Sequence, residues 1–194
     1  MIWNRVDPSK VHRLFYPQVS VVIVVESDGH VGAMPAIWCM PLSFNPPLIG
    51  IALAPEHETC RMIKKARGFT VNWLDYSHAH EVGELGEISG RDFADKLAAV
   101  KLRTVKSNGN PQPLIREASA ALECQVREEH RTGTHELVIG EAVEAHASAH
   151  FRDYWDFSKY EPLLYAGTEQ KRGKSWRFMS TRRATMRVPF KHDG

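Results

Sequence analysis

Residues 31–47, V-G-A-M-P-A-I-W-C-M-P-L-S-F-N-P-P, hold an unusual mixture of side chains for a β-strand. A strand buried on both faces is normally a run of Val, Ile and Leu. Here two prolines, a tryptophan, a cysteine and a serine interrupt the run, and a Pro-Pro pair closes it. Because proline lacks a backbone donor, it is confined to strand edges, bulges and turns. The segment is therefore predicted to be an irregular strand edge whose backbone and small side chains face something other than another strand.

An edge of this kind could cradle a flat heteroaromatic ring such as the isoalloxazine of a flavin. That ring needs an apolar face to pack against and backbone N–H donors at its pyrimidine edge, and those donors tune its electronics. Pro35 and Pro41 would hold the backbone away from the ladder, and Trp38 offers a large rigid plane. Taken alone, Trp38 is better explained as an ordinary core aromatic, because buried tryptophan is common.

The string M-P-A-x-W-x-x-P-L-S-F-x-P-P resembles the signature of the flavin reductase-like family of FMN-binding split barrels. The resemblance covers roughly residues 15–167 and is most specific at 34–47 and 135–142. It implies that the flavin is lined by Met34, Pro35, Ala36, Trp38, Cys39, Met40 and Ser43. One departure is Gly32, where many members carry Asn, so an amide side chain that could reach the ring is absent.

The phosphate of FMN requires hydroxyls, backbone amides at a helix start and a cation. Thr59 begins a helix expected over 59–66, as the family's threonine does, and a plain N-cap is an equal alternative. The segment S-G-R-D-F-A-D-K resembles the family's second phosphate or ribityl contact, with its lysine one residue later than usual. The resemblance implies contacts from Ser89, Gly90, Arg91 and Lys96. Arg91 alone is better explained as part of an exposed charge pair.

Two further residues are assigned to the site by the resemblance. His135, in G-T-H-E-L-V-I-G-E-A, starts an expected strand where the family often carries His close to the flavin and the nicotinamide. Its imidazole could donate to the flavin or assist proton movement, and a half-buried structural histidine is an equal alternative. Tyr165 lies in Y-E-P-L-L-Y-A-G, where the family places an aromatic near the cofactor. No catalytic side chain is predicted to be essential, because flavin reduction depends mainly on positioning.

The remaining patterns describe a mainly β chain with short helices. Strands are expected at 19–26, followed by an Asp-Gly hairpin turn, and at 31–44, 48–53 and 69–74. Two longer strands, 120–129 and 135–146, follow a loop over 106–117. Helices are expected at 58–67, ended by Gly68, at 78–86, and after Asp92 as its cap. The last third, 151–194, shows turn signals and little periodicity. Six or seven strands with short helices favour a closed antiparallel barrel, and the resemblance implies a Greek-key split β-barrel.

Composition excludes several functional classes. The 194 residues fit one domain, 1–194, and a net charge of +2 with scattered Lys and Arg does not favour nucleic acid. The longest apolar run is too short to span a membrane, and no signal-peptide pattern is present. Three widely separated cysteines without a C-x-x-C pair indicate neither disulfides nor a metal site. A cytoplasmic location is expected.

The resemblance implies an FMN-binding homodimer with the flavin near the dimer interface. The first hypothesis is an NAD(P)H-dependent flavin reductase that passes electrons to a partner oxygenase or ferric iron. The second is a flavoredoxin-like electron carrier without nicotinamide turnover, and the third is a binding protein without redox turnover. A nicotinamide groove could come from Lys171, Arg172, Lys174, Arg177, Arg182, Arg183 and Arg187, although a solvated basic tail explains them better. NADH and NADPH are not distinguished by the sequence.

Overall fold

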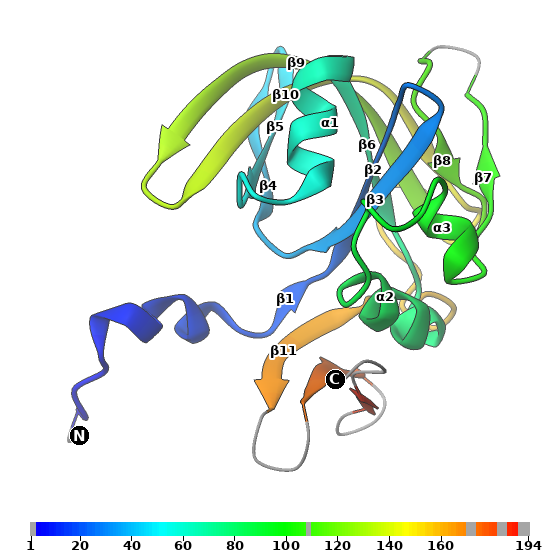
Figure 1. Ribbon diagram of the computed structural model, residues 1–194. Coiled ribbons are helices and arrows are strands. Elements are labelled where there is room, and N and C mark those ends of the chain that lie inside the picture. Colours follow the sequence, from blue (N-terminus) through cyan, green and yellow to red (C-terminus); the bar gives the residue numbers. More distant parts are fainter. Residues whose placement is uncertain (1–2, 108–109, 170–173, 182–185, 190–194) are drawn as a thin grey trace.

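The computed structural model describes residues 3–107, 110–169, 174–181 and 186–189 (Figure 1). Within them, the main element is a seven-stranded sheet that is antiparallel throughout. Its strands in spatial order are β3 (His30–Ala36), β2 (Val21–Ser27), β6 (Gly68–Trp73), β9 (Ala120–Thr132), β10 (His135–Ala147), β5 (Pro47–Leu53) and β4 (Cys39–Phe44). The two edge strands, β3 and β4, are consecutive in sequence. The signature segment therefore forms both edges of the sheet, as its prolines predict.

Strand β2 explains how the sheet supports two cores. Its side chains alternate between them, because successive residues of a strand point to opposite faces. Val22 and Val24 join one cluster with α2 (Ala79–Leu85) and α3 (Lys96–Ala99). Val21, Ile23 and Val25 join the other cluster with α1 (Glu58–Ala66). Burial on both faces accounts for the unbroken β-branched run in this strand.

The expected hairpin, strands and helices of the first half are confirmed, with three corrections to their bounds and caps. The 31–44 stretch forms two strands, because the chain bends at 37–38. Arg67, not Gly68, ends α1 in the left-handed conformation, with φ of 58°, and Gly68 already pairs in β6. Asp95, not Asp92, caps α3, since its carboxylate accepts the Leu97 and Ala98 amides at 3.0 Å. Helix α3 is therefore shorter than expected and begins at Lys96.

The last third contains strands that its sequence does not reveal. A second sheet has the order β1 (Gln18–Val19), β11 (Leu164–Glu169), β12 (Ser175–Met179) and β13 (Met186–Pro189). It packs on α2 through Trp176, Phe178 and Val188. The expected loop 106–117 also contains β8 (Leu114–Ile115), which pairs with β7 (Thr104–Val105). Strands β7 and β8 are only two residues long, and β11 pairs with β1 from the far end of the chain. Neither arrangement leaves a strong local pattern, which explains both errors.

The N-terminal segment projects from the body of the molecule as an arm (Figure 1). It contains the 3₁₀ helix η1 (Pro8–Phe15), which has no buried residue, and Leu14 and Phe15 expose more than two-thirds of their surface. A second 3₁₀ turn, η2 (Tyr76–His78), precedes α2. Among the helices that the structure describes, none has the length and apolar character needed to cross a bilayer.

Candidate functional site

The signature residues divide between the two faces of the sheet edge. Met34 and Ala36 pack against the core that holds α1, together with the partly buried Cys39. Burial raises the pKa of the Cys39 thiol to about 12, so this group is held as the neutral thiol. Pro35 points to the other side, where it lines a small hollow with Tyr165. The edge therefore offers apolar side chains on both faces.

Trp38 and His135 meet at the bend between β3 and β4. Their ring centroids lie 4.5 Å apart with an interplanar angle of 49°. The Trp38 carbonyl accepts the Ala52 amide at 2.9 Å, which fixes the bend against β5. His135 begins β10, and its Nδ1 lies 2.9 Å from the Thr134 hydroxyl. Trp38 and His135, almost a hundred positions apart in sequence, thus form one aromatic wall. Trp38 is 38% exposed in this wall.

Lys96 is the most unusual ionisable group near this wall. Only 5% of the residue is exposed, and no ion pair or hydrogen bond of its ammonium group occurs within the described parts of the chain. Burial lowers the pKa of Lys96 to about 8, because the charged form loses its hydration. A buried cation without an anion is costly, so this group fits an anionic ligand that the protein binds.

His57 connects Lys96 to the aromatic wall and was not singled out from the sequence. Burial lowers its pKa, the Glu56 carboxylate opposes that shift, and the charges of Lys96 and His135 add to it. His57 is therefore close enough to both Lys96 and His135 for their charges to act on it. Only the position of His57 directly before the α1 start could have indicated a role.

Thr59 lies in the first turn of α1 and is 3% exposed. The N-cap of α1 is His57, which makes no side-chain capping bond, so the expectation that Thr59 caps the helix is wrong. No hydrogen bond of its hydroxyl is found among the residues that the structure describes. The first-turn amides of a helix favour anions, and the unpaired hydroxyl lies among them.

The loop before Lys96 is fixed to the start of α1 by Arg91. Its Nε donates to the Glu58 carboxylate at 3.3 Å, and its Nη2 donates to the Glu56 carbonyl at 3.3 Å. The Ser89 hydroxyl accepts the Arg91 amide at 3.2 Å, and Gly90 lies against the Glu58 side chain. The structure thus gives Ser89 and Arg91 partners within the protein, and Arg91 holds together the two segments that carry Thr59 and Lys96.

The other candidates lie farther around the sheet edge. Met40 lines an apolar hollow of about 440 Å³ with Trp38 and Cys39, under the N-terminal arm. Ser43 is half-buried beside the register shift of β4. Tyr165 donates to or accepts from the Thr168 hydroxyl at 2.8 Å and packs on Tyr16. Tyr165 therefore lies beside Pro35, in the small hollow that both residues line.

Within the described residues, no three His, Cys, Asp or Glu side chains are grouped so that they could hold a metal ion. Of the C-terminal basic residues, Lys174 and Arg177 are described. For Arg187 the structure describes only the backbone, which lies in β13. The remaining four lie outside the described residues, namely Lys171, Arg172, Arg182 and Arg183.

Comparison with known proteins decides the family. The Flavin reductase like domain matches residues 12–174, which is most of the chain. This protein is a member of the flavin reductase-like family. An uncharacterised protein from Aeropyrum pernix is 33% identical over 181 residues, covering 93% of this chain and 69% of that protein. A protein from Archaeoglobus fulgidus named ferric-chelate reductase (NAD(P)H) is 30% identical over 126 residues, covering 64% and 72%.

The fold of this family member matches solved structures over its whole length. The FMN-binding protein from Thermus thermophilus superposes with a TM-score of 0.72 at 22% identity, covering 100% of this chain and 99% of that protein. The chain is therefore a mainly β split barrel with antiparallel sheets, as the sequence predicts. The candidate residues lie on the edge strands β3 and β4, at the starts of α1, α3 and β10, and on β11 of this barrel.

Proposed function

We propose that this flavin reductase-like protein binds FMN and works as an NAD(P)H-dependent flavin reductase. The observation that carries the proposal is the buried, unpaired Lys96, because it needs an anion to balance its charge. The unpaired Thr59 hydroxyl and the first-turn amides of α1 supply the donors that a phosphate monoester prefers. FMN carries one such group at the end of its ribityl chain.

The residues present fit the rest of the cofactor. Trp38 and His135 provide an aromatic wall, and Met34 and Ala36 provide an apolar strand edge with bent backbone. Bound FMN would supply the hydride acceptor and one-electron chemistry that no protein side chain offers. The protein's part is to bind and orient the ring and to exclude water from one face. His135, with Nδ1 next to Thr134, would orient its other nitrogen toward the ring edge.

The reductase assignment is supported by the name of the Archaeoglobus fulgidus relative, which includes NAD(P)H and a ferric chelate. We therefore propose a nicotinamide nucleotide as the electron donor of this chain. The proposed electron acceptor is ferric iron or a partner oxygenase. The three free cysteines agree with a cytoplasmic setting, because buried thiols persist where the environment is reducing.

A homodimer is proposed from the surface of β4. Trp38, Met40, Leu42 and Phe44 are 38%, 55%, 41% and 100% exposed, and together they make an apolar edge on the described surface. Exposed apolar patches of this kind mark contact sites between protein chains. Because Trp38 belongs to this edge, a second copy placed there would also cover the proposed flavin site.

Anaerobic absorption spectroscopy tests the proposal. We expect desalted protein reconstituted with FMN to keep a flavin spectrum and to bleach when NADH or NADPH is added, which also identifies the donor. Retained flavin that neither nucleotide bleaches would favour the flavoredoxin-like carrier instead. If no flavin is retained but free FMN is reduced in the cuvette, the protein is a reductase that uses flavin as a substrate. Without that reduction, the flavin assignment is wrong.

A further inference from the structure

A hollow of about 350 Å³ lies at the end of the β9–β10 pair farthest from His135. Strands β7 and β8 border it, and they lie across the molecule from the tip of the β9–β10 hairpin (Figure 1). His135 begins β10, whereas His146, which lines the hollow, lies next to the last residue of the same strand. None of the described residues that line the hollow belongs to the proposed flavin site. Its volume lies within the range of about 300–1,000 Å³ that small-molecule sites occupy.

A buried carboxylate lies behind His146. Glu123 on β9 is 0% exposed, and its Oε1 lies 2.7 Å from His146 Nε2. Within the described parts of the chain this is the only hydrogen bond of the carboxylate, whose Oε2 has no partner. A buried carboxylate is costly, and apolar residues of similar volume would fill the space without that cost. The pair is therefore better explained by the orientation it gives His146 than by stability.

The Glu123 contact determines which ring nitrogen of His146 is left for a ligand. Because Nε2 faces the carboxylate, Nδ1 is the remaining nitrogen, and it makes no hydrogen bond among the residues that the structure describes. The histidine side chain is 44% exposed at the wall of the hollow. A protonated imidazole has an N–H at both nitrogens, so it can donate to Glu123 and to a bound anion at once. Glu144 lies opposite Glu123 in the strand register, but it is exposed and does not line the hollow.

Arg116 adds a cation to the same hollow. Its guanidinium has no carboxylate partner in the part of the chain that the structure describes. Arg103, whose carbonyl accepts the Arg116 amide, is by contrast paired with Glu117 at 2.6 Å. Because protonated His146 and Glu123 neutralise each other, Arg116 is the charge that remains for a ligand. Guanidinium groups bind carboxylates with two parallel hydrogen bonds.

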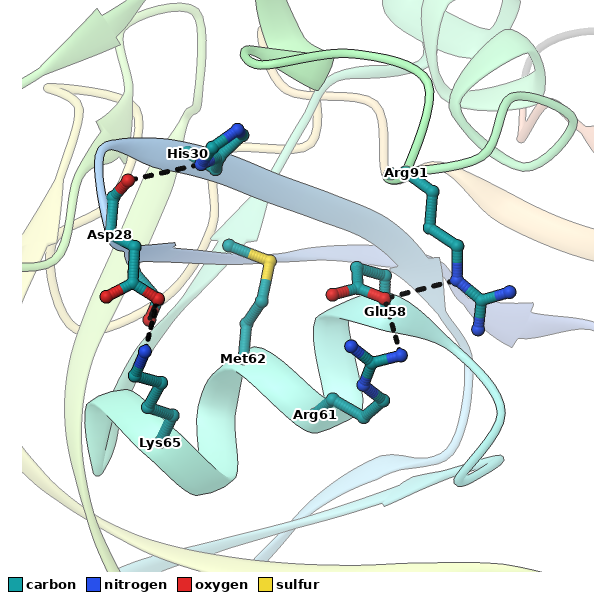
Figure 2. A pocket seen from close by; sticks show the side chains of 9 residues that line it. Asp28, His30, Glu58, Arg61, Met62, Lys65 and Arg91 are labelled. Atoms are coloured by element: carbon teal, nitrogen blue, oxygen red, sulfur yellow. Dashed lines mark hydrogen bonds and ion pairs between the residues drawn. The ribbon is translucent and has the colours of Figure 1, made fainter.

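The larger hollow along α1, of about 490 Å³, differs in this respect (Figure 2). The Arg and Lys side chains that line it are already paired within the protein. Arg61 and Arg91 contact the Glu58 carboxylate, and Lys65 contacts Asp28. The hollow at the end of β10 instead leaves a guanidinium and an imidazole nitrogen for a ligand.

The rest of the hollow is lined mainly by small apolar side chains. Ile115 and Ala121 are 3% and 4% exposed, and Ala118, Ala120 and Ala147 also line it. Short side chains leave room for an apolar group next to the two cationic groups. Such a group gains free energy when it is removed from water.

We propose that this hollow binds a small organic carboxylate with an apolar body. The carboxylate accepts hydrogen bonds from the Arg116 guanidinium and from His146 Nδ1, and Glu123 holds the imidazole in place. The apolar body lies against Ile115 and Ala121. The inference is independent of the proposed flavin reductase activity, because the two sites share no lining residue.

NMR titration of the isotope-labelled, FMN-saturated protein with benzoate tests this inference, because benzoate joins one carboxylate to a compact apolar ring. We expect one benzoate per chain to shift the amide signals of residues 115–121 and 146–148. Benzamide has nearly the same shape without the charge, and acetate has the charge without the ring. Each should bind about tenfold more weakly than benzoate, or weaker still. The FMN-free protein should give the same Kd for benzoate, so failure of the flavin proposal is recognised separately.

The variants separate the contributions of the two cationic groups. Arg116→Gln should weaken benzoate binding about tenfold and leave the fold intact, because Arg116 is exposed. Arg152→Gln is the matched control, since Arg152 is also an exposed arginine without a carboxylate partner among the described residues, and it does not line the hollow. The double variant Glu123→Gln, His146→Gln removes both charges of the pair together, so no buried carboxylate is left unpaired. It should fold and bind benzoate about tenfold more weakly.

Three results would overturn the inference. The first is that benzoate does not shift the signals of these residues, and the second is that benzamide binds as tightly as benzoate. The third is that Arg116→Gln, or the double variant, keeps the wild-type affinity for benzoate. Unchanged FMN affinity in each variant shows that the protein is still folded.

Discussion

Lys96 links the stability of the protein to the function proposed for it. Its ammonium group is buried, and its pKa is lowered to about 8 in the folded chain from the ordinary value of 10.5. A group whose pKa falls on folding binds its proton more tightly in the unfolded chain, so its charge opposes folding at neutral pH. The same charge is what a phosphate monoester would neutralise.

We expect Lys96→Met to stabilise the cofactor-free protein by roughly 1–3 kcal/mol at pH 7, because the uncompensated desolvation is removed. The gain should shrink as the pH rises above about 8, since the folded wild-type chain then loses this proton first. Thermal unfolding of both proteins between pH 6 and 10 measures the difference. A variant less stable than wild type at pH 7 would contradict the burial argument.

The lowered pKa of Lys96 also predicts how the affinity for FMN depends on pH. Affinity of the wild type should be highest below about 8 and fall as the pH rises, because the free protein then loses the Lys96 proton. Lys96→Arg should keep its affinity at high pH, whereas Lys96→Met should bind weakly throughout. Fluorescence titration with FMN checks all three proteins. An affinity that is independent of pH in the wild type would remove Lys96 from the site.

Thr59 allows a test of the hydroxyl alone. Thr59→Val keeps the shape of the buried side chain and removes its donor, so FMN binding should weaken by about 1 kcal/mol or more. Thr59→Ser keeps the hydroxyl and should bind FMN nearly as well as the wild type. Equal affinities for the two variants would mean that the hydroxyl does not meet the phosphate.

At the scale of elements, the long strands β9 and β10 depend on a glycine. A Cβ atom at Gly140 would lie 2.7 Å from Cζ of the fully buried Phe69 and 3.1 Å from Cβ of Cys124. Gly140→Ala should therefore destabilise the protein by about 1–3 kcal/mol through overpacking. Chemical denaturation measures the loss. Adding Phe69→Leu to Gly140→Ala should restore part of it, and no restoration would mean that the aromatic ring is not the cause.

The elements also show what the sequence can predict and where it fails. Strands β2, β6, β9 and β10 were predictable because each alternates or forms a β-branched run that reflects local burial. The short strands β1 and β11 pair although about 145 residues separate them, and such pairing leaves no local pattern. The site divides in the same way. Trp38, Thr59 and Lys96 follow from a family signature, whereas the closeness of His57 to Lys96 and His135 exists only in the folded chain.

At the scale of the whole molecule, we expect the apolar edge of β4 to hold two copies together. Phe44 is fully exposed, so Phe44→Asp should leave the fold intact and shift the protein toward a monomer. Light scattering after size-exclusion chromatography measures the change. Tyr154→Asp is the control, since Tyr154 is 86% exposed and does not belong to β4. A wild-type protein that is monomeric at all concentrations would contradict the dimer.

The buried charge of Lys96 has a consequence for how much of the protein a cell can maintain. If FMN neutralises that charge, the vitamin-derived cofactor is also a ligand of the folded state, and each tenfold excess over its Kd adds about 1.4 kcal/mol to the unfolding free energy. Chains made without flavin would unfold more often and be removed by proteases. Riboflavin supply would then set the amount of this protein as well as its activity, with no dedicated regulator.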